Sequence, residues 1–377
     1  MKRRRILAAG CGVAAVAAVP ALRTSAQEQP IVLGQSAPLT GPASELGLQF
    51  MQGAQCHFHQ VNARGGVAGR RIELHTLDDG YDPEQCARNT KQFIERGVFA
   101  LFGYIGTATS VAAMPMIVEA RKLFIAPFSG SEALRIPYYP FVFHLRASYV
   151  DETTAIVRHL LSLGIRRIGV FYQDDSEGKS GLLGVGRAMK LQYLAPTGIG
   201  KVERNSVDVD LAVRTILAEK PDAIVLISTY LPCAAVIRSA RKAGYSGMFC
   251  TISSVGTQAL ARELSQESRG VIVSQVMPYP YAVTTPLAGD YLAAGKAAMG
   301  AAFAPSYSGI EGYVAARVFA EAMHNAKKFS QEGAIAALES LHDFDLGGFD
   351  VSLAPGKHVA SRLVELTILT ADGKIRR

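Results

Sequence analysis

Short β-branched runs alternate with longer helical patterns along the chain, and this alternation most narrows what the chain can fold into. In its first part the expected strands lie at 31–36, 71–77, 100–103 and 123–126, and the expected helices at 47–62, 82–96 and 107–120. Strands that alternate with helices of this length form parallel sheets with right-handed crossovers. The sequence therefore predicts an α/β fold.

The same rhythm restarts near residue 150. The second set of expected elements comprises helices at 151–163, 182–191, 211–219 and 232–243 and strands at 168–172, 223–227, 247–251 and 271–273. Helical patterns at 287–299, 311–326 and 331–341 and a strand-like stretch at 363–369 complete the chain. Two successive α/β blocks, followed by this mainly helical segment, predict two doubly wound parallel-sheet lobes.

Ligands of such sheets lie outside the carboxyl ends of the strands. The residues just after each expected strand are therefore the candidates for a site. They are 37–47, 79–82, 104–109, 127–131, 173–179, 229–232 and 252–256.

The first 26 residues have the pattern of a cleavable export signal. Basic residues 2–5 precede an uncharged stretch at 6–22, and Thr24-Ser25-Ala26 offers small residues for cleavage. A membrane anchor is the alternative, but a short stretch rich in Ala and Gly and interrupted by Pro20 spans a bilayer poorly. The adjacent arginines leave both the Sec and the twin-arginine routes open. We expect the mature chain in the periplasm.

Most of the excess positive charge belongs to this leader. The whole chain carries a formal charge of +7, with 39 Lys and Arg residues against 32 acids, and five of the 39 and none of the acids lie in the leader. A nearly neutral mature chain argues against a nucleic-acid partner.

Four cysteines remain after the leader: Cys56, Cys86, Cys233 and Cys250. Four cysteines allow three pairings in an oxidising compartment, and burial as free thiols is equally open. Cys56 and Cys86 each fall on an expected helix of the first block, so that pair is the favoured disulfide.

Signatures of catalysis are weak throughout. No Ser has Gly at both second flanking positions, as a nucleophile elbow needs. Gly178-Lys179-Ser180 resembles the end of a phosphate loop, but Gln173 stands where its first Gly belongs. His57 and His59 lie on different faces of a helix and make a poor metal pair. We expect a binding protein rather than an enzyme, with no cofactor and no metal.

Short motifs in a fixed order follow the expected strands. They are Gly34-Gln35-Ser36-Ala37-Pro38-Leu39-Thr40-Gly41-Pro42, the Asn62, Gly65, Gly66 and Gly69 set, Asp78-Asp79 with Asp82-Pro83, Pro127-Phe128-Ser129-Gly130, Gln173-Asp174-Asp175 and Lys242-Ala243-Gly244. Together they resemble the Leu/Ile/Val-binding receptors of branched-chain amino acid ABC transporters, over nearly the whole mature chain.

This resemblance implies the type I periplasmic binding fold, in which hinge crossovers join two lobes. The N-terminal lobe is then expected to comprise residues 27–147 with 276–346. The C-terminal lobe is expected to comprise residues 148–275 with 347–377.

By the same resemblance, four residues of the first lobe hold the ligand. Thr107 falls where a Ser or Thr opens a helix and grips a carboxylate, although a plain helix cap would have the same sequence. Phe128, Ser129 and Gly130 align with the loop that holds both ends of an α-amino acid.

Four further residues complete the implied site. Asp151 matches an acid that pairs with the ligand ammonium, with the cap of its own helix as the alternative, and Tyr149 precedes it by two. Tyr230 aligns with an aromatic side chain that closes over the ligand. Ser253 stands where the family can show an acid.

The chain departs from the family pattern at several of these positions. Gly130 stands where a Thr is frequent, and Leu46 replaces a Tyr. Glu177 replaces an aromatic residue, and it either pairs with a basic ligand or is solvated, the second being the expectation. Glu311, near the start of a C-terminal helix, is a candidate for supporting the residues that hold the ligand.

The resemblance implies an exported substrate-binding protein of an ABC importer. It would bind a branched-chain amino acid, or a related small carboxylate or amide, between the lobes and deliver it to permease subunits in the inner membrane. A periplasmic sensor of the same fold that signals to a regulator is one alternative. An exported enzyme that uses Asp or Glu acid–base chemistry is the other.

Overall fold

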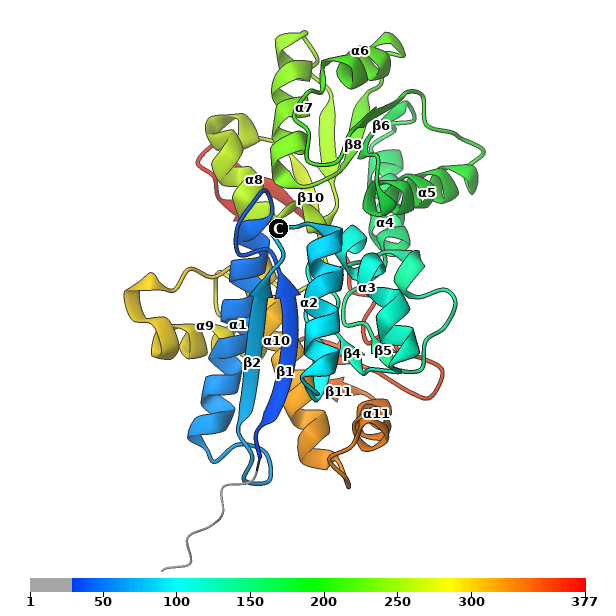
Figure 1. The fold of residues 1–377 in the computed structure, drawn as a ribbon. Helices are drawn as coiled ribbons and strands as arrows, with labels where there is room; N and C mark the ends of the chain where they lie inside the picture. Colours follow the sequence, from blue (N-terminus) through cyan, green and yellow to red (C-terminus); the bar gives the residue numbers. More distant parts are fainter. Residues whose placement is uncertain (1–28) are drawn as a thin grey trace, which may run out of the picture.

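The structure is a computed structural model that describes residues 29–377, arranged as two lobes (Figure 1). The expected export signal lies outside the described residues. Among residues 29–377, no helix combines the length and the apolar character that crossing a bilayer requires.

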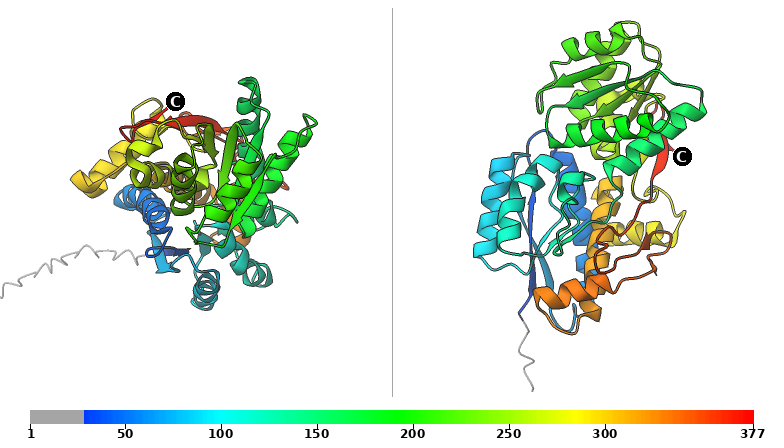
Figure 2. Two further views of the ribbon diagram at one scale, coloured as in Figure 1. Left: turned by 90° about the horizontal axis from the view of Figure 1, so that it is seen from above. Right: turned by 90° about the vertical axis from the view of Figure 1, so that its right-hand side faces the viewer.

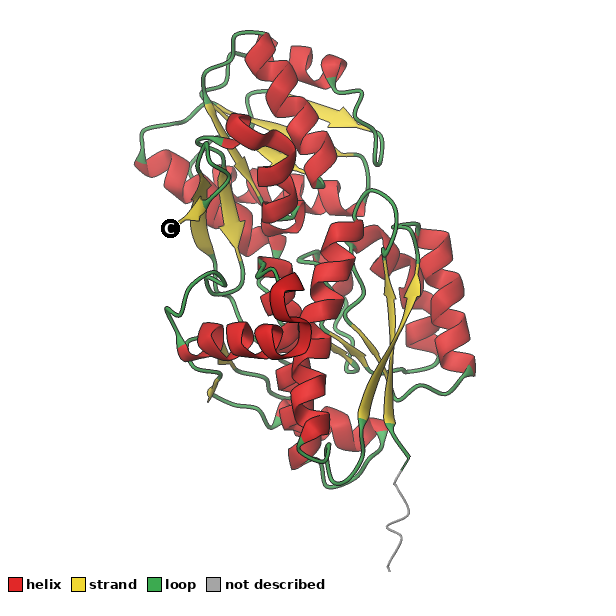
Figure 3. Ribbon diagram, turned by 90° about the vertical axis from the view of Figure 1, so that its left-hand side faces the viewer, coloured by secondary structure: helices red, strands yellow, loops and turns green. Residues whose placement is uncertain are grey.

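A five-stranded parallel sheet forms the centre of the first lobe. Its order is β2-β1-β3-β4-β5, with β1 at Ile31–Ala37, β2 at Ile72–Asp78, β3 at Ala100–Phe102, β4 at Phe124–Ile125 and β5 at Val142–Phe143. The helices of this lobe are α1 (Ser44–Ala63), α2 (Pro83–Glu95), α3 (Thr107–Glu119), α9 (Pro286–Met299), α10 (Tyr307–Asn325) and α11 (Gln331–Glu339). Helices cover both faces of the sheet (Figure 3).

Glycines let α1 and α10 lie unusually close together. A Cβ added at Gly53 would stand 1.8 Å from the carbonyl oxygen of Gly309, and one at Gly312 would stand 2.0 Å from that of Phe50. Only residues without a side chain fit this contact. The close approach fixes a C-terminal helix against the first helix of the chain.

A seven-stranded sheet forms the centre of the second lobe. Its order is β14-β13-β10-β9-β8-β6-β7, with β6 at Ile168–Gln173, β7 at Ile199–Val202, β8 at Ala223–Ile227, β9 at Met248–Thr251, β10 at Ile272–Gln275, β13 at Glu365–Leu369 and β14 at Ile375–Arg376. Strand β13 runs antiparallel to both of its neighbours, and the other pairs are parallel. The helices are α4 (Tyr149–Ser162), α5 (Ser176–Lys190), α6 (Asp210–Ala218), α7 (Tyr230–Lys242) and α8 (Thr257–Leu264). The mixed α/β fold with two sheet lobes is thus confirmed.

The chain crosses between the lobes three times, after β5, after β10 and before β13. A hairpin of β11 (Phe344–Asp345) and β12 (Asp350–Val351) precedes the last crossing. Val359 then pairs with His144, and the Ala360 N–H donates to the His144 carbonyl at 2.8 Å. The third crossing therefore comes after residue 360, later than the expected boundary between 346 and 347. Figure 2 (right) shows the C-terminal strand on the second lobe and α11 at the far end of the first.

All four cysteines of the described chain are free and buried, so the expected Cys56–Cys86 disulfide is wrong. Cys56 packs with α1 and α10 residues such as Phe58 and Phe319, whereas Cys86 packs in a separate cluster with Phe93 and Tyr104. The two thiols belong to different cores of the first lobe.

Candidate functional site

Three hydroxyl groups meet at the carboxyl ends of β3 and β4. The Thr107 Oγ1 atom lies 2.8 Å from the Ser129 Oγ atom and 3.2 Å from the Tyr149 hydroxyl. All three residues have no exposed surface. Thr107 is the first residue of α3, and Gly106 before it provides no side chain to cap that helix. The helix N-terminus is left electropositive, which favours an anion beside the hydroxyl cluster.

The ring of Tyr149 fills the space beside Gly130 where a side chain would otherwise lie. A Cβ at Gly130 would stand 2.4 Å from the Cδ1 atom of the Tyr149 ring, and the Gly130 carbonyl accepts the Tyr149 N–H at 2.8 Å. The ring thus takes the volume that a Thr at position 130 would need. The hydroxyl group of the same ring lies 3.2 Å from Thr107 Oγ1.

Arg146, on the first crossing between the lobes, is only 1% exposed. Its Nε atom lies 3.1 Å from Glu311 Oε1 in the first lobe, and its Nη2 donates to Ser253 Oγ in the second lobe at 2.8 Å. Its guanidinium carbon stands 4.1 Å from the centre of the Phe128 ring. Arg146 is therefore a buried cation held by both lobes at the hinge.

Ser253 links this cation to a buried acid. Its N–H and its hydroxyl both donate to the Glu152 carboxylate, at 2.8 and 3.0 Å, and Ser274 donates to the same group at 2.6 Å. Burial raises the pKa of Glu311 to about 7, although the charge of Arg146 acts in the opposite direction. The expectation that Glu311 supports the predicted site residues agrees with these contacts, because it holds Arg146 beside Phe128 and Ser253.

Tyr81 and Glu177 join the two lobes across the cleft. The Tyr81 hydroxyl, from the loop between β2 and α2, donates to Glu177 Oε2 at the start of α5 at 3.2 Å. Glu177 is only 2% exposed, so the expectation of a solvated side chain is wrong. Burial raises its pKa to about 7, and the neighbouring Asp175 adds to the shift. Arg204 covers the Tyr81 ring, with its guanidinium carbon 4.4 Å from the ring centre.

Asp151 takes part in a capping box at the start of α4. Its Oδ2 atom accepts the Ser148 N–H at 3.0 Å and the Ser148 hydroxyl at 2.6 Å, while the Ser148 Oγ atom accepts the Asp151 N–H. The structure therefore shows the capping alternative. A contact between Asp151 and the ligand stays a prediction.

Tyr230 opens α7 and is half-buried. Thr229 before it is buried, and its hydroxyl has no hydrogen-bond partner within the described part of the chain. Burial raises the pKa of Tyr230, and the nearby Glu45 adds to this effect. Glu45 at the start of α1 pairs with Arg262 of α8, so Tyr230 lies where the two lobes meet.

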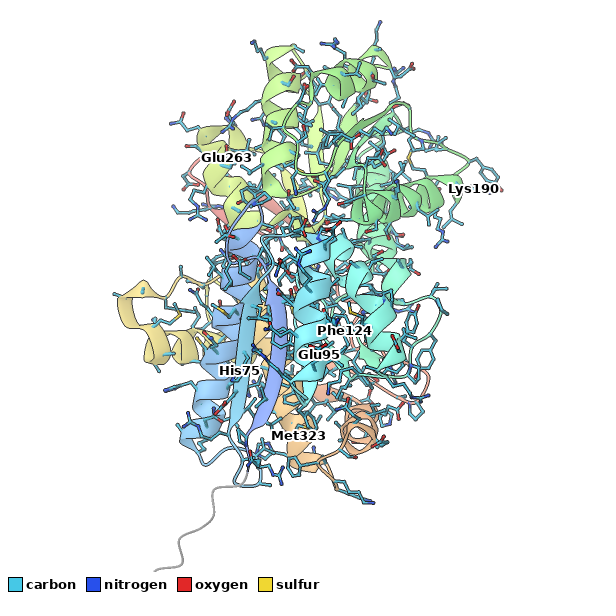
Figure 4. The ribbon with its side chains drawn as sticks, viewed as in Figure 1. His75, Glu95, Phe124, Lys190, Glu263 and Met323 are labelled. Carbon is cyan, nitrogen blue, oxygen red and sulfur yellow. The ribbon has the colours of Figure 1, made fainter. Side chains whose placement is uncertain are left out.

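The junction between the lobes is nearly filled. The cavity between Phe128, Arg146, Ser253 and Glu311 has a volume of only about 10 Å³, far too little for an amino acid. In Figure 4, Glu263 and Lys190 mark opposite sides of the second lobe, and side chains crowd the junction below them.

A hollow of about 780 Å³ lies elsewhere, beside the second crossing, with Tyr279 and Arg262 in its lining. We place the site at the filled junction, because buried polar groups from both lobes converge there. In the lining of the 780 Å³ hollow, the guanidinium group of Arg262 is already paired with Glu45.

The sequence assigned no site role to Tyr81, Arg146, Glu152 or Arg204, although the expected strand that leads into Arg146 is part of the family resemblance. Tyr81 lies within the 79–82 segment that the strand-end rule marks as a candidate. Arg146 follows the edge strand β5 in the same way. For Glu152 and Arg204 the sequence holds no comparable signal. Glu152 meets Ser253 and Ser274 only through the fold of the second lobe, and Arg204 covers a ring of the first lobe.

Nearly the whole described chain matches a known family. Residues 30–374 match the model of the periplasmic binding protein family. A crystal structure described as a possible leucine/isoleucine/valine-binding protein from Rhodopirellula baltica SH 1 is 32% identical, with a TM-score of 0.88 over 93% of this chain and 96% of that one. A substrate-binding periplasmic protein from Ralstonia solanacearum is also 32% identical, with a TM-score of 0.85 over 92% and 99%.

Among curated relatives, the Leu/Ile/Val-binding protein of Escherichia coli (strain K12) is 19% identical over 64% of this chain. The match spans 66% of that relative's own length.

The chain belongs to the periplasmic binding protein family, as a type I member of its branched-chain amino acid group, and the predicted resemblance is confirmed. Proteins of this family and fold bind solutes and are not enzymes.

Proposed function

We propose that this chain is the exported substrate-binding protein of an ABC importer. It binds an amino acid, branched-chain or of similar size, between its lobes and delivers it to permease subunits in the inner membrane. The relatives named above support this role, and the two matched crystal structures cover nearly the whole chain. The periplasm is its proposed location.

The observation that carries the proposal is the hydroxyl cluster at the uncapped start of α3. Thr107, Ser129 and Tyr149 present three hydroxyl groups at a positive helix end, where a ligand carboxylate is favoured. Hydrogen bonds to a charged group contribute about 1.5–3 kcal/mol each. Three or four of them offset desolvation and reach micromolar affinity, which corresponds to about 8 kcal/mol.

Ligand exchange requires the lobes to separate, because the filled junction leaves no room for an amino acid. The three crossings allow a hinge motion of the kind that closes two lobes around a ligand. Tyr230 and the loop at Ser253 move with the second lobe and cover the ligand held by the first. The closed form then presents surfaces of both lobes to the permease.

Calorimetry of the mature protein against the twenty L-amino acids and a set of small carboxylic acids tests this proposal. Thr107→Ala should weaken binding of the best ligand by more than about tenfold, since at least one hydrogen bond to a charged group is lost. Glu95→Gln is the matched control, an exposed side chain at the far end of α2 (Figure 4). Absence of binding by every carboxylate would reject the proposal.

A further inference from the structure

Glu177 is a buried carboxylate with one unused oxygen at the junction of the lobes. Its Oε2 atom accepts the hydroxyl of Tyr81, whereas its Oε1 atom is buried without a hydrogen-bond partner among residues 29–377. The Ser254 hydroxyl is near enough to favour the charged form but makes no aligned hydrogen bond. A carboxylate oxygen in such a place is costly unless a donor meets it.

No cation of the described chain forms an ion pair with Glu177. Arg204, on the same lobe, lies 3.3 Å from Asp175 instead and covers the Tyr81 ring. Arg146 acts on Glu177 only at longer range, because its guanidinium faces Glu311 and Ser253. Among residues 29–377, Glu177 is thus a buried carboxyl group without an ion-pair partner at the junction of the lobes.

The two other positions that the family resemblance offers for an acid do not supply one. Asp151 uses its Oδ2 atom for the cap of α4. Position 253 is a Ser, engaged with Arg146 and Glu152. The Tyr81 ring, whose hydroxyl donates to Glu177, also lies against Gly106, where an added Cβ would stand 2.5 Å from its Cε2 atom. Because Gly106 directly precedes Thr107, Glu177 and the hydroxyl cluster lie on either side of one ring.

We infer that Glu177, rather than Asp151, accepts the ammonium group of the ligand, so that the protein selects amino acids over simple carboxylic acids. The inference rests on the proposed function, because it assigns the other end of the same ligand. The carboxylate lies at the α3 hydroxyl cluster, and the ammonium donates to the free Oε1 atom. Glu177 is then a specificity-determining residue.

A pH dependence follows from this placement. In the free protein Glu177 is partly protonated near pH 7, whereas a bound ammonium favours its charged form. Binding should therefore release protons, and affinity should rise as the pH increases through about 7. The groups that face Glu177 from the surrounding elements are Asp175, Tyr81, Tyr149, Arg146 and Cys233.

The test compares the tightest-binding L-amino acid with its analogue that lacks the amino group. The wild-type protein should bind the amino acid at least about tenfold more tightly, as expected for one charge-assisted hydrogen bond. Glu177→Gln should weaken amino-acid binding by a similar factor and leave the affinity for the analogue unchanged. It should also abolish the proton release that accompanies amino-acid binding. Asp151→Asn and the control Glu95→Gln should keep the preference.

The outcomes separate the two proposals. If the analogue binds the wild-type protein as tightly as the amino acid does, or if Glu177→Gln keeps the preference, the assignment of Glu177 is overturned while the proposed function stands. If no carboxylate binds at all, the proposed function fails. If Glu177→Gln folds poorly, the wild-type protein alone decides the question. Calorimetry in two buffers of different ionisation enthalpy measures how many protons are released on amino-acid binding. Binding without proton release overturns the assignment.

Discussion

The aromatic ring of Tyr149 lies against Gly130 so closely that no side chain at position 130 could coexist with it. Gly130→Ala should therefore lower the free energy of unfolding by about 1–3 kcal/mol, because an added group in a packed interior forces side chains to shift. It should also weaken ligand binding, since the Tyr149 hydroxyl would leave Thr107. Denaturant titration and calorimetry measure the two effects.

Gly186 provides the matched control for this substitution. It lies within α5, and a Cβ added there meets nothing within 4 Å. Gly186→Ala should raise the free energy of unfolding by about 0.5–1 kcal/mol through helix propensity. Equal effects of the two substitutions would show that the Gly130–Tyr149 contact does not restrict position 130.

Removal of Arg146 should damage stability more than any surface change. Arg146→Met leaves Glu311 buried without its cation, and breaking a buried ion pair costs about 3–5 kcal/mol. Adding Glu311→Gln should restore part of this loss, because the carboxylate left without its cation is then removed as well. Urea unfolding of the single and double variants measures this coupling, and Arg214→Met on an exposed face of α6 serves as the control. Purely additive losses would contradict it.

Buried acids should make the protein less stable as the pH rises toward neutrality. The folded chain holds the Glu311 proton to about pH 7, above the ordinary value of 4.5. Between these values the folded state binds more protons than the unfolded state, so the contribution of this group is complete below pH 4.5 and is lost as the pH increases through 7. Asp79, whose pKa burial raises to about 6, acts in the same direction.

Glu311→Gln should therefore make the fall in unfolding free energy between pH 5 and 7 shallower, whereas Glu95→Gln should leave its slope unchanged. Urea titrations at several pH values provide the measurement. A slope that Glu311→Gln does not alter would mean that Glu311 titrates normally in the folded protein.

The four free cysteines predict a clear thiol titration. A thiol reagent should modify almost none of them in the folded mature protein and all four after unfolding, because each is buried. A reducing agent should not change the melting temperature. Any drop in melting temperature on reduction would reveal a disulfide that the structure does not contain.

The sequence predicted most of the fold because hydrophobic periodicity reports helices and strands directly. The start of α2 is confirmed in detail: Asp82 accepts the Gln85 N–H at 2.7 Å, and Pro83 occupies the first turn. Strand β7 was missed, since Gly200 and Lys201 weaken a short β-branched run. Helix α8 was missed because its eight residues span barely two turns.

The site was predicted less completely, because its chemistry depends on contacts between distant residues. Thr107, Ser129 and Tyr149 were named and do come together. The burial of Glu177 could not be foreseen, since it depends on Tyr81, which lies 96 positions earlier in the chain and in the other lobe. Likewise, one sequence pattern fits both a helix-capping role and a ligand-binding role for Asp151, and the structure shows the first.

The three crossings also dictate an order of assembly. The first lobe takes its sheet from the beginning of the chain, but α10, which packs on α1, and the segment that pairs with His144 come only after the parallel strands of the second lobe. During synthesis the second lobe can complete its parallel core while the first still exposes the face meant for α10. That apolar surface stays open to solvent until the residues of α10 follow.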